Sequence, residues 1–253
     1  MSFKVVIPAR LNSTRLPRKV LRDLAGKPML RHVWESARLA GAEEVVIATD
    51  SEEVQAVCAD FGAVVRMTAV THASGTDRVN EIAQVAGWSA QTIVVNLQGD
   101  EPLMPPALIR QVAELLARDS AADLASLCHP LHRREDWLNP NIVKLVMDCE
   151  DYALYFSRAP IPWRRDGGSA QAPQMPEGLC QRHIGLYAYR VAALARFSAL
   201  PVAPLEQCEA LEQLRALSQG LRIKMGVTDQ PPPRGVDTEE DLQAVVRLLA
   251  PRP

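Results

Sequence analysis

The chain has 253 residues, of which 28 are Lys or Arg and 30 are Asp or Glu, so its formal net charge is −2. This near balance excludes a global attraction to nucleic acid or to anionic membranes, so any affinity for anions must be local. No apolar run reaches the roughly 18 residues of a membrane span, and Arg10 and Arg15 follow the first apolar stretch rather than precede it, unlike a signal peptide. We therefore expect a cytoplasmic protein that binds neither nucleic acid nor membrane. The five cysteines, without a C-x-x-C pair, are expected to be reduced thiols.

Short β-branched runs alternate with helical patterns through the first half of the chain, which is typical of βαβ units on a mostly parallel sheet. The predicted strands are residues 3–9, 43–50, 63–68 and 91–102, and the predicted helices are residues 27–42, 51–62 and 76–87. Ligands of such open sheets bind beyond the carboxyl ends of the strands. The three loops PARLNSTRLPRK, ATDS and LQGDEP should therefore converge on one crevice.

The second half is less regular and is expected to extend the sheet with strands of mixed direction. Residues 206–220 predict one amphipathic helix, and residues 164–178, rich in Gly, Pro and small side chains, predict a mobile surface loop. The C-terminal stretch predicts a strand, a Pro-rich turn and a helix capped by Asp237 or Thr238. Further strands are predicted at residues 122–131, 141–148, 152–158 and 183–190.

The loop PARLNSTRLPRK concentrates cations at the end of the first predicted strand. The stretch contains neither the G-x-G-x-x-G nor the G-x-x-x-x-G-K-[ST] motif, so side chains must bind any phosphate. Guanidinium groups hold phosphate oxygens with paired donors, and a Lys adds a mobile point charge. Arg10, Arg15, Arg18 and Lys19 are therefore candidates for holding a triphosphate, and a solvated basic loop is the alternative.

Two carboxylates are candidates for a metal site. Asp100 follows a buried-looking strand in VVNLQGDEP, and Asp237 lies in RGVDTEEDL. Magnesium prefers one or two carboxylates together with phosphate oxygens, and an Asp at a strand end offers a fixed direction for such a bond. The alternatives are that Asp100 caps the following turn and that Asp237 is a plain helix N-cap.

Other polar residues are candidates for contacts with a base or a sugar. HASGTDR, residues 72–78, can bring backbone amides and small hydroxyls near a base or ribose, unless Ser74 or Thr76 only caps the next helix. His183 and Arg158, beside predicted strands, offer an acidic sugar a hydrogen-bond donor and a cation, although a lone His is more often structural. The acids Glu206, Glu209 and Glu212, with Gln213, lie on one predicted helix, and their alternative is an exposed stripe.

An ordered set of motifs makes the sequence resemble the 3-deoxy-manno-octulosonate cytidylyltransferases, also called CMP-KDO synthetases. The resemblance covers nearly the whole chain, from Lys4 to Leu249. Its motifs are IPARLNSTRLPRKVL, GKPML, VVIATDSEEV, HASGTDR, VNLQGDEP, NPNIVKLV, ALYFSRAPIPW, RHIGLYAYR, PLEQCEALEQLR and GVDTEEDL.

The resemblance implies a GT-A-like α/β nucleotidyltransferase fold, three-layered around a mostly parallel mixed sheet. It implies a single domain over residues 1–253, a sugar-binding and dimerisation portion within about 128–225, and a homodimer. The implied reaction joins CTP and 3-deoxy-D-manno-octulosonate (KDO) into CMP-KDO for lipopolysaccharide biosynthesis, with Mg²⁺ as cofactor and release of pyrophosphate. The resemblance assigns catalysis to Arg10, Lys19 and Asp100, metal binding to Asp100 and Asp237, and substrate binding to Arg15, Ser74, Gly75, Gln98, Arg158, His183, Tyr187, Glu212 and Gln213.

The sequence departs from the family pattern at two loops. LPRKV stands where the family has LPGKP, and Arg234 replaces another Gly. Because Arg tolerates a positive φ poorly, the first loop is expected to take another backbone path, with Arg18 in solvent. Two rival functions remain, a cytidylyltransferase for another acidic sugar such as 8-amino-KDO or a sialic-type acid, and a non-catalytic nucleotide-binding homologue. A nucleic-acid-binding module is disfavoured, because basic residues are not interleaved with aromatic ones.

Overall fold

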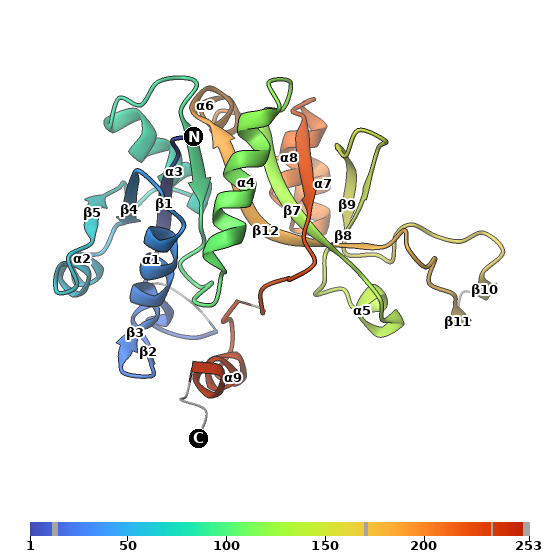
Figure 1. Ribbon diagram of the computed structural model, residues 1–253, viewed down its shortest axis with the longest axis horizontal. Helices are drawn as coiled ribbons and strands as arrows, with labels where there is room; N and C mark the ends of the chain where they lie inside the picture. The colour runs from blue at the N-terminus through green and yellow to red at the C-terminus, as the bar shows by residue number, and fades with distance from the viewer. Residues whose placement is uncertain (12–14, 170–171, 234, 250–253) are drawn as a thin grey trace.

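A nine-stranded mixed sheet runs through the computed structural model, which describes residues 1–11, 15–169, 172–233 and 235–249 (Figure 1). Its strands are β1 (Lys4–Ala9), β4 (Glu44–Thr49), β5 (Val64–Met67), β6 (Ile93–Asn96), β7 (Leu124–Pro130), β8 (Lys144–Met147), β9 (Ala153–Ser157), β12 (Gln181–Arg190) and β13 (Ile223–Val227). The main path has the order β13-β7-β12-β6-β1-β4-β5, and β8 and β9 extend the sheet beside β12. Among the strands of this path β12 alone runs antiparallel to its neighbours, so the predicted mixed and mostly parallel sheet is confirmed.

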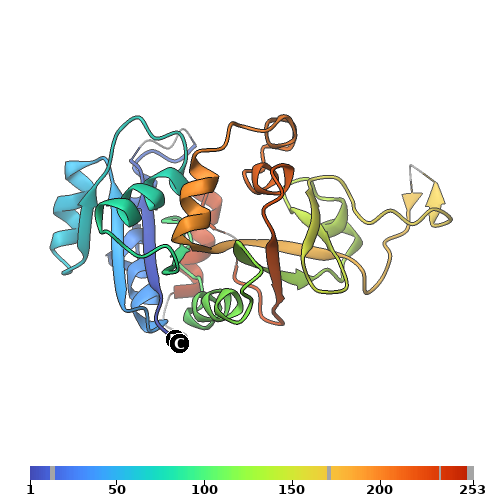
Figure 2. The same ribbon diagram turned by 90° about the horizontal axis from the view of Figure 1, so that it is seen from above.

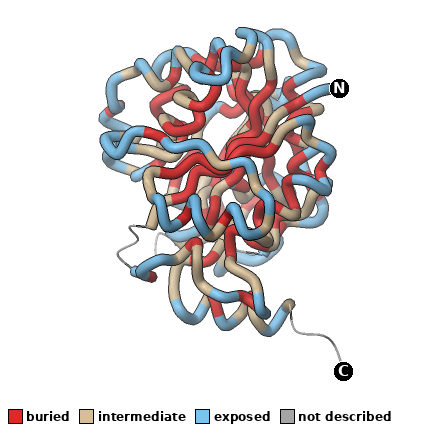
Figure 3. The backbone as a smooth tube through the Cα atoms, turned by 90° about the vertical axis from the view of Figure 1, so that its left-hand side faces the viewer, coloured by how far each residue is buried: buried red, intermediate tan, exposed pale blue. Residues whose placement is uncertain are grey.

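Helices cover both faces of the sheet, which gives the three predicted layers (Figures 1 and 2). The helices are α1 (Met29–Leu39), α2 (Glu52–Ala59), α3 (Gly75–Val85), α4 (Pro106–Arg118), α5 (Arg134–Leu138), α6 (Val191–Ser198), α7 (Pro204–Glu209), α8 (Gln213–Ser218) and α9 (Glu239–Leu249). Successive side chains of β1 point to opposite faces, so Val5 and Ile7 join the core with α1, α2 and α4, whereas Val6 joins the core with α3, α6 and α8. Figure 3 shows these buried strands crossing the middle of the molecule.

The C-terminal helix α9 lies against the first loop of the chain. The short strands β2 (Asp23–Leu24) and β3 (Lys27–Pro28) pair into a hairpin that lies beside α9 at one end of the molecule (Figure 1). Leu24 and Met29 pack there with Val236, Leu242 and Val245 in a small apolar cluster. Because of this packing, the segment before α9, which contains Val236 and Asp237, lies near the carboxyl ends of β1 and β6.

A thin arm projects from the molecule at the right of Figures 1 and 2. It carries the short strands β10 (Gly168–Ser169) and β11 (Ala172–Pro173), which pair antiparallel. The predicted surface loop at residues 164–178 thus contains a small hairpin, and its mobility stays a prediction.

Several elements differ from the prediction. The single helix predicted at 206–220 is two helices, because Ala210 adopts a left-handed φ of 49° that ends α7 before α8 begins. The helices α4, α5 and α6 are not among the predicted elements, although α4 buries Leu108, Val112 and Leu116 at helical spacing. All five cysteines are free, as predicted. Among the described residues, no helix is both long and apolar enough to cross a membrane.

Candidate active site

All three predicted loops leave the sheet at one edge, because β1, β4 and β6 are parallel, and two of them line the candidate cavities there. Lys4, Val5 and Val6 of β1 pair in parallel with Val94, Val95 and Asn96 of β6, so the loops after both strands leave at the same edge. A Cβ atom on Gly99 would lie 2.9 Å from the backbone oxygen of Pro8, so the close approach of the two loops requires a glycine there.

The third predicted loop, ATDS, lies outside the candidate cavities in the described part of the chain. The carboxylate of Asp50 instead pairs with the buried guanidinium of Arg78, which also donates to Thr68. Ser51 caps α2 by accepting a hydrogen bond from the amide of Val54. This loop therefore holds the fold beside the site.

Lys19 joins the two predicted metal carboxylates. Its Nζ lies 2.6 Å from Oδ2 of Asp100 and 3.0 Å from Oδ1 of Asp237, and Nη2 of Arg15 lies 3.1 Å from the same Asp237 oxygen. Burial lowers the pKa of Lys19, but Asp100 and then Asp237 raise it more, so its net pKa lies above the ordinary value. Lys19 is therefore charged at neutral pH and lies between two carboxylates.

The backbone at Arg18 places Lys19 in this position. Arg18 adopts a left-handed φ of 57° and precedes a one-turn 3-10 helix, η1 (Lys19–Leu21). The expectation of another backbone path is thus wrong, since Arg18 takes up the positive φ that a glycine would use. Its exposed guanidinium pairs with Glu53 of α2. Arg234, the second departure from the family pattern, lies outside the described residues.

The Asp237 carboxylate is not used to cap α9, because the neighbouring Thr238 caps this helix. Oγ1 of Thr238 accepts from the amide of Asp241, and the Asp241 carboxylate accepts from the amides of Asp237 and Thr238. Of the two predicted caps of α9, Asp237 and Thr238, it is therefore Thr238 that caps the helix. The amide of Val236 donates to the backbone oxygen of Asp100 over 2.9 Å, which ties this segment to the strand-end turn.

Arg10 lines a cavity that it shares with these carboxylates, and one of its buried donors is unpaired among the described residues. The cavity measures about 320 Å³ and is lined by Pro8, Arg10, Arg15, Lys19, Val20, Gly75, Gln98, Gly99, Asp100 and Asp237. Nη2 of Arg10 is buried and has no hydrogen-bond partner among the described residues. Burial, and then the charge of Arg78, lower the pKa of Arg10. A buried guanidinium donor is costly unless an acceptor such as a phosphate oxygen meets it.

The predicted cytidine-side residues divide between the cavity and the helix behind it. Gly75 and Gln98 line the cavity, and a Cβ on Gly75 would lie 3.2 Å from the Pro8 ring. Ser74 is the N-cap of α3, because its hydroxyl accepts from the amide of Asp77 while the Asp77 carboxylate accepts from the amide of Ser74. Ser74 therefore caps the following helix, which is the alternative to a contact with the base or ribose.

A second cavity of about 590 Å³ adjoins the first, with Arg15, Asp100 and Asp237 lining both. Arg158 and His183 line this second cavity, as do Glu101, Asn141 and Arg182, which the sequence reasoning missed. Burial, and then the neighbouring Asp100, raise the pKa of Glu101 to about 8. The signal was available, because Asn141 and Arg182 lie within motifs that carried the family resemblance and Glu101 follows Asp100.

His183 is a neutral hydrogen-bonding group. Burial, and then the charge of Arg182, lower the pKa of His183 to about 3. Its Nε2 lies 2.9 Å from Oγ of Ser126, a hydroxyl that also faces the backbone oxygens of Ile184 and Leu186. Those oxygens can only accept, so they take the single hydroxyl proton and Nε2–H donates to Ser126. Nδ1 of His183 then remains an acceptor.

The other predicted sugar-side residues, Tyr187, Glu212 and Gln213, do not line this cavity. The ring of Tyr187 lies 5.3 Å from that of His183, centre to centre, and burial raises the pKa of Tyr187 well above its ordinary value. Glu212 accepts from Oγ1 of Thr76 over 2.7 Å, and its other oxygen is buried without a partner among the described residues. Gln213 is buried beside Glu212 at the start of α8. The alternative that Glu206, Glu209 and Glu212 form an exposed acidic stripe is therefore wrong, since Glu206 also pairs with Arg215 and has only 12% of its side chain exposed.

Backbone carbonyls accept hydrogen bonds from the cations Arg158 and Lys144 beside the second cavity. Arg158 lines the cavity, yet its guanidinium donates to the carbonyls of Glu209 (2.6 Å), Pro140 (3.0 Å) and Ala210 (3.4 Å). Lys144, which the sequence reasoning missed, is fully buried and donates to three carbonyl oxygens at 2.6 to 2.8 Å. Those oxygens belong to Asn139, Ile142 and Arg158. Burial lowers the pKa of Lys144 to about 8, while the Glu209 carboxylate acts in the opposite direction.

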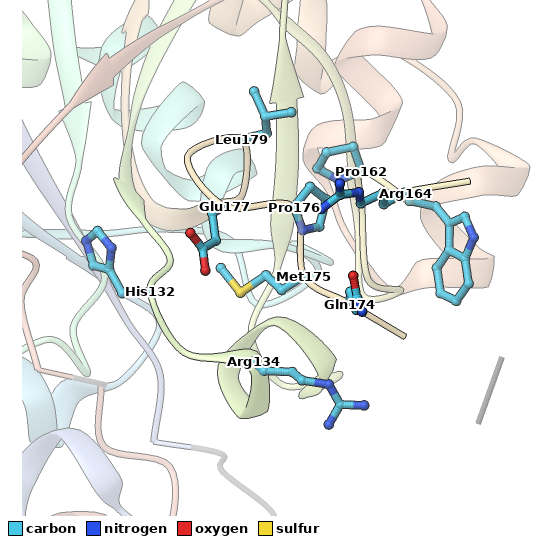
Figure 4. Close-up of a pocket in the computed structure, with 10 residues that line it drawn as sticks. His132, Arg134, Pro162, Arg164, Gln174, Met175, Pro176, Glu177 and Leu179 are labelled. Atoms are coloured by element: carbon cyan, nitrogen blue, oxygen red, sulfur yellow. The ribbon is translucent and has the colours of Figure 1, made fainter. Parts of the chain in front are cut away.

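A larger cavity of about 790 Å³ lies at the base of the arm (Figure 4). It is lined by His132, Arg134, Pro162, Trp163, Arg164, Gln174, Met175, Pro176, Glu177 and Leu179. It shares no lining residue with the two cavities at the strand ends. Size alone therefore does not locate the chemistry.

Comparisons with known proteins agree with this geometry. A family model described as cytidylyltransferase matches residues 4–223. Two relatives are named 3-deoxy-manno-octulosonate cytidylyltransferase. The one from Thioalkalivibrio sulfidiphilus is 55% identical in an alignment that covers 98% of this chain and 99% of the relative. The one from Nitrosococcus oceani is 52% identical over 98% of this chain and 97% of the relative. A solved structure of CMP:2-keto-3-deoxy-manno-octonic acid synthetase complexed with CTP superposes with a TM-score of 0.88 at 39% identity, over 98% of both chains. The chain therefore belongs to the cytidylyltransferase family, within the group of the 3-deoxy-manno-octulosonate cytidylyltransferases.

Proposed function

We propose that this chain transfers CMP from CTP to KDO, releasing pyrophosphate and forming CMP-KDO for lipopolysaccharide biosynthesis. The observation that carries the proposal is the contact of Lys19 with Asp100 and Asp237, at strand ends where two polar cavities meet. The names of the relatives and the CTP complex of the similar solved structure support CTP and KDO as the substrates. Relatives at this level of identity do not favour the rival acidic sugars.

On the nucleotide side, cations meet the charge of the triphosphate. Arg10 offers a buried donor without a protein partner, and Arg15 and Lys19 line the same cavity. Gly75 and Gln98 would contact the cytidine side, where a Cβ atom at residue 75 would crowd Pro8. Fixed donors aimed at phosphate oxygens stabilise the charge that develops as pyrophosphate leaves.

On the sugar side, the anomeric hydroxyl of KDO would attack the α-phosphorus in line. One bond forms between the anomeric oxygen and phosphorus, the bond to the departing pyrophosphate breaks, and the hydroxyl proton passes to water. The neutral His183 ring offers Nδ1 as an acceptor for a sugar hydroxyl, and Arg158 keeps the cavity wall in place. Positioning of the two substrates supplies a large part of the acceleration in such a transfer.

The residues present fit Mg²⁺ held jointly by protein and nucleotide. In the described ranges, no group of three or more His, Cys, Asp and Glu side chains is arranged to hold a metal ion. Asp100 and Asp237 supply two carboxylates around one cationic position, and Mg²⁺ commonly uses one or two carboxylates with substrate phosphates. Bound there, Mg²⁺ would neutralise charge on the phosphate oxygens.

A pyrophosphate-release assay with CTP, Mg²⁺ and a panel of sugar acids tests the proposal. KDO should give the highest kcat/KM, above 8-amino-KDO and a sialic-type acid. A preference for one of the other acids would support the first rival function. CTP binding without pyrophosphate release for any acid would reject the enzyme and support a non-catalytic nucleotide-binding protein.

We also propose that the chain is a single-domain cytoplasmic homodimer whose second copy docks within residues 128–225. Exposed apolar side chains in this portion support the dimer, notably Trp163 and Leu179 with 50% and 64% of their surface accessible. Both line the cavity at the base of the arm, and Figure 4 labels Leu179 there. Light scattering after size exclusion should give a mass near twice that of the chain, and Trp163→Ser should lower it.

A further inference from the structure

Lys19 occupies the position that a cation shared by Asp100 and Asp237 would need. We propose that Lys19 is a placeholder for the metal: without nucleotide its ammonium holds the two carboxylates together, and Mg²⁺ reaches them only with CTP. The inference rests on the proposed function, because it assigns a second position to a residue of that site. It makes Lys19 a positioning residue for Asp100 and Asp237 before it meets phosphate.

The distances show that ammonium and metal exclude each other. Nζ of Lys19 is 2.6 Å from Oδ2 of Asp100 and 3.0 Å from Oδ1 of Asp237. Mg²⁺ binds oxygen at about 2.0 to 2.1 Å, so an ion bound to these same two oxygens would be a second cation directly beside Nζ. Lys19 must therefore give up these oxygens before the metal can bind them.

The surroundings favour Lys19 over a hydrated metal when nucleotide is absent. The Lys19 side chain has only 12% of its surface exposed, so its contacts with Asp100 and Asp237 are partly shielded from water. Mg²⁺ loses its water reluctantly, and two carboxylates replace few of its six ligands. Arg15, 3.1 Å from the same Asp237 oxygen, adds a second competing cation. Metal binding alone should therefore be weak.

The triphosphate removes this competition. The cavity that Lys19 lines also contains Arg10, whose buried Nη2 has no partner among the described residues, so phosphate oxygens are expected beside Lys19. Those oxygens give the ammonium a new anionic partner and give the metal its missing ligands. Metal and nucleotide should therefore bind with positive coupling, which by linkage is the same in both directions.

The test measures Mn²⁺ binding, by EPR of free Mn²⁺, to the wild-type chain and to Lys19→Gln without sugar acid. Mn²⁺ serves as probe because it shares the preference of Mg²⁺ for carboxylate oxygens. Without CTP, Lys19→Gln should bind Mn²⁺ on the order of 10-fold more tightly than wild type. With CTP the advantage should shrink, because wild-type Lys19 has then left the carboxylates. Equal Mn²⁺ affinity of the two proteins without CTP would overturn the proposal.

Two further variants make the outcome specific. Arg22→Gln removes the same charge from the same loop, but Arg22 pairs with Glu239, so its Mn²⁺ affinity should stay within about twofold of wild type. A gain in Arg22→Gln as large as in Lys19→Gln would reject the placeholder in favour of net charge. Lys19→Arg keeps a cation between the carboxylates and should bind Mn²⁺ as weakly as wild type, and a 10-fold gain there would also reject the proposal. Because no sugar acid is present, these results stand apart from the outcome of the transferase assay.

Discussion

The two walls of the site are built by different interactions. On the nucleotide-side wall, the cations Arg15 and Lys19 pair with the carboxylates of Asp100 and Asp237. On the sugar-side wall, formed by Lys144, Arg158, His183 and Glu209, the two cations donate mainly to backbone carbonyls. A bound ligand can replace one partner of a side-chain ion pair. A hydrogen bond from a cation to a backbone carbonyl can break only if the backbone of the wall moves. The nucleotide-side wall is therefore suited to exchange partners, and the sugar-side wall to keep its shape.

Asp100→Asn should produce the largest loss of activity of all the variants and should change the stability of the fold little. The change removes one charge from the pair that faces Lys19 and from the proposed Mg²⁺ position. We expect kcat/KM for pyrophosphate release to fall about 10³-fold, which is about 4 kcal/mol of transition-state stabilisation. The free energy of unfolding in urea should change by about 1 kcal/mol or less, because the Asp100 side chain is one-third exposed.

Asp60→Asn is the matched control, since Asp60 is an exposed carboxylate at the end of α2. Its activity should stay near wild type. An Asp100→Asn enzyme with wild-type kcat/KM would remove Asp100 from the metal site.

Lys144→Met tests the other half of the comparison. The three carbonyl oxygens that Lys144 satisfies would lose their donor inside the protein, so the free energy of unfolding should fall by about 3 kcal/mol. In the folded enzyme, KM for the sugar acid should rise while KM for CTP stays unchanged, because Lys144 ties residues 139–142 to Arg158. Urea unfolding and the two KM values measure this split.

Lys27→Met is the control for Lys144→Met, because Lys27 pairs with Glu35 on the surface and its loss should cost about 1 kcal/mol or less. An equal rise in both KM values for Lys144→Met would mean that the sugar-side wall has no separate role.

The nucleotide-side wall is also the part that the sequence predicts best. Lys19 and Asp100 follow strands, and the parallel arrangement of β1 and β6 brings their loops to one edge whatever the details of packing. The role of Lys144 could not be predicted in this way, because two of its carbonyl partners, Asn139 and Ile142, precede β8 and the third, Arg158, follows β9. The break at Ala210 was equally hidden, since the apolar pattern continues through it and only the backbone there turns left-handed.

His183→Gln tests whether burial on the sugar-side wall carries a pH dependence. Burial lowers the pKa of His183 to about 3, so between that value and the ordinary 6.5 the unfolded chain binds a proton that the folded chain does not. His183 therefore makes wild-type stability fall as pH decreases through this window, by at most about 1.4 kcal/mol per pH unit. Urea unfolding at pH 6.5 and pH 5 should show a smaller loss in His183→Gln, by about 2 kcal/mol at most. Parallel losses in both proteins would show that His183 is protonated as readily in the folded chain as in the unfolded one.

Arg18→Gly should have the smallest effect, and it tests how the nucleotide-side loop keeps Lys19 in position despite its departure from the family pattern. A non-glycine residue at a left-handed φ of 57° costs about 1 kcal/mol, and the exposed pair of Arg18 with Glu53 returns only part of that. Arg18→Gly should therefore raise the free energy of unfolding by about 0.5 kcal/mol, whereas Arg18→Ala keeps the strained backbone, loses the pair and should lower it slightly. Both variants should release pyrophosphate at the wild-type rate, because the exposed Arg18 side chain pairs with Glu53 and lines neither cavity of the site. If Arg18→Gly instead lost activity while Arg18→Ala kept it, the left-handed turn would be needed for rigidity around Lys19, and the exchangeable wall would depend on a strained backbone as well as on its charges.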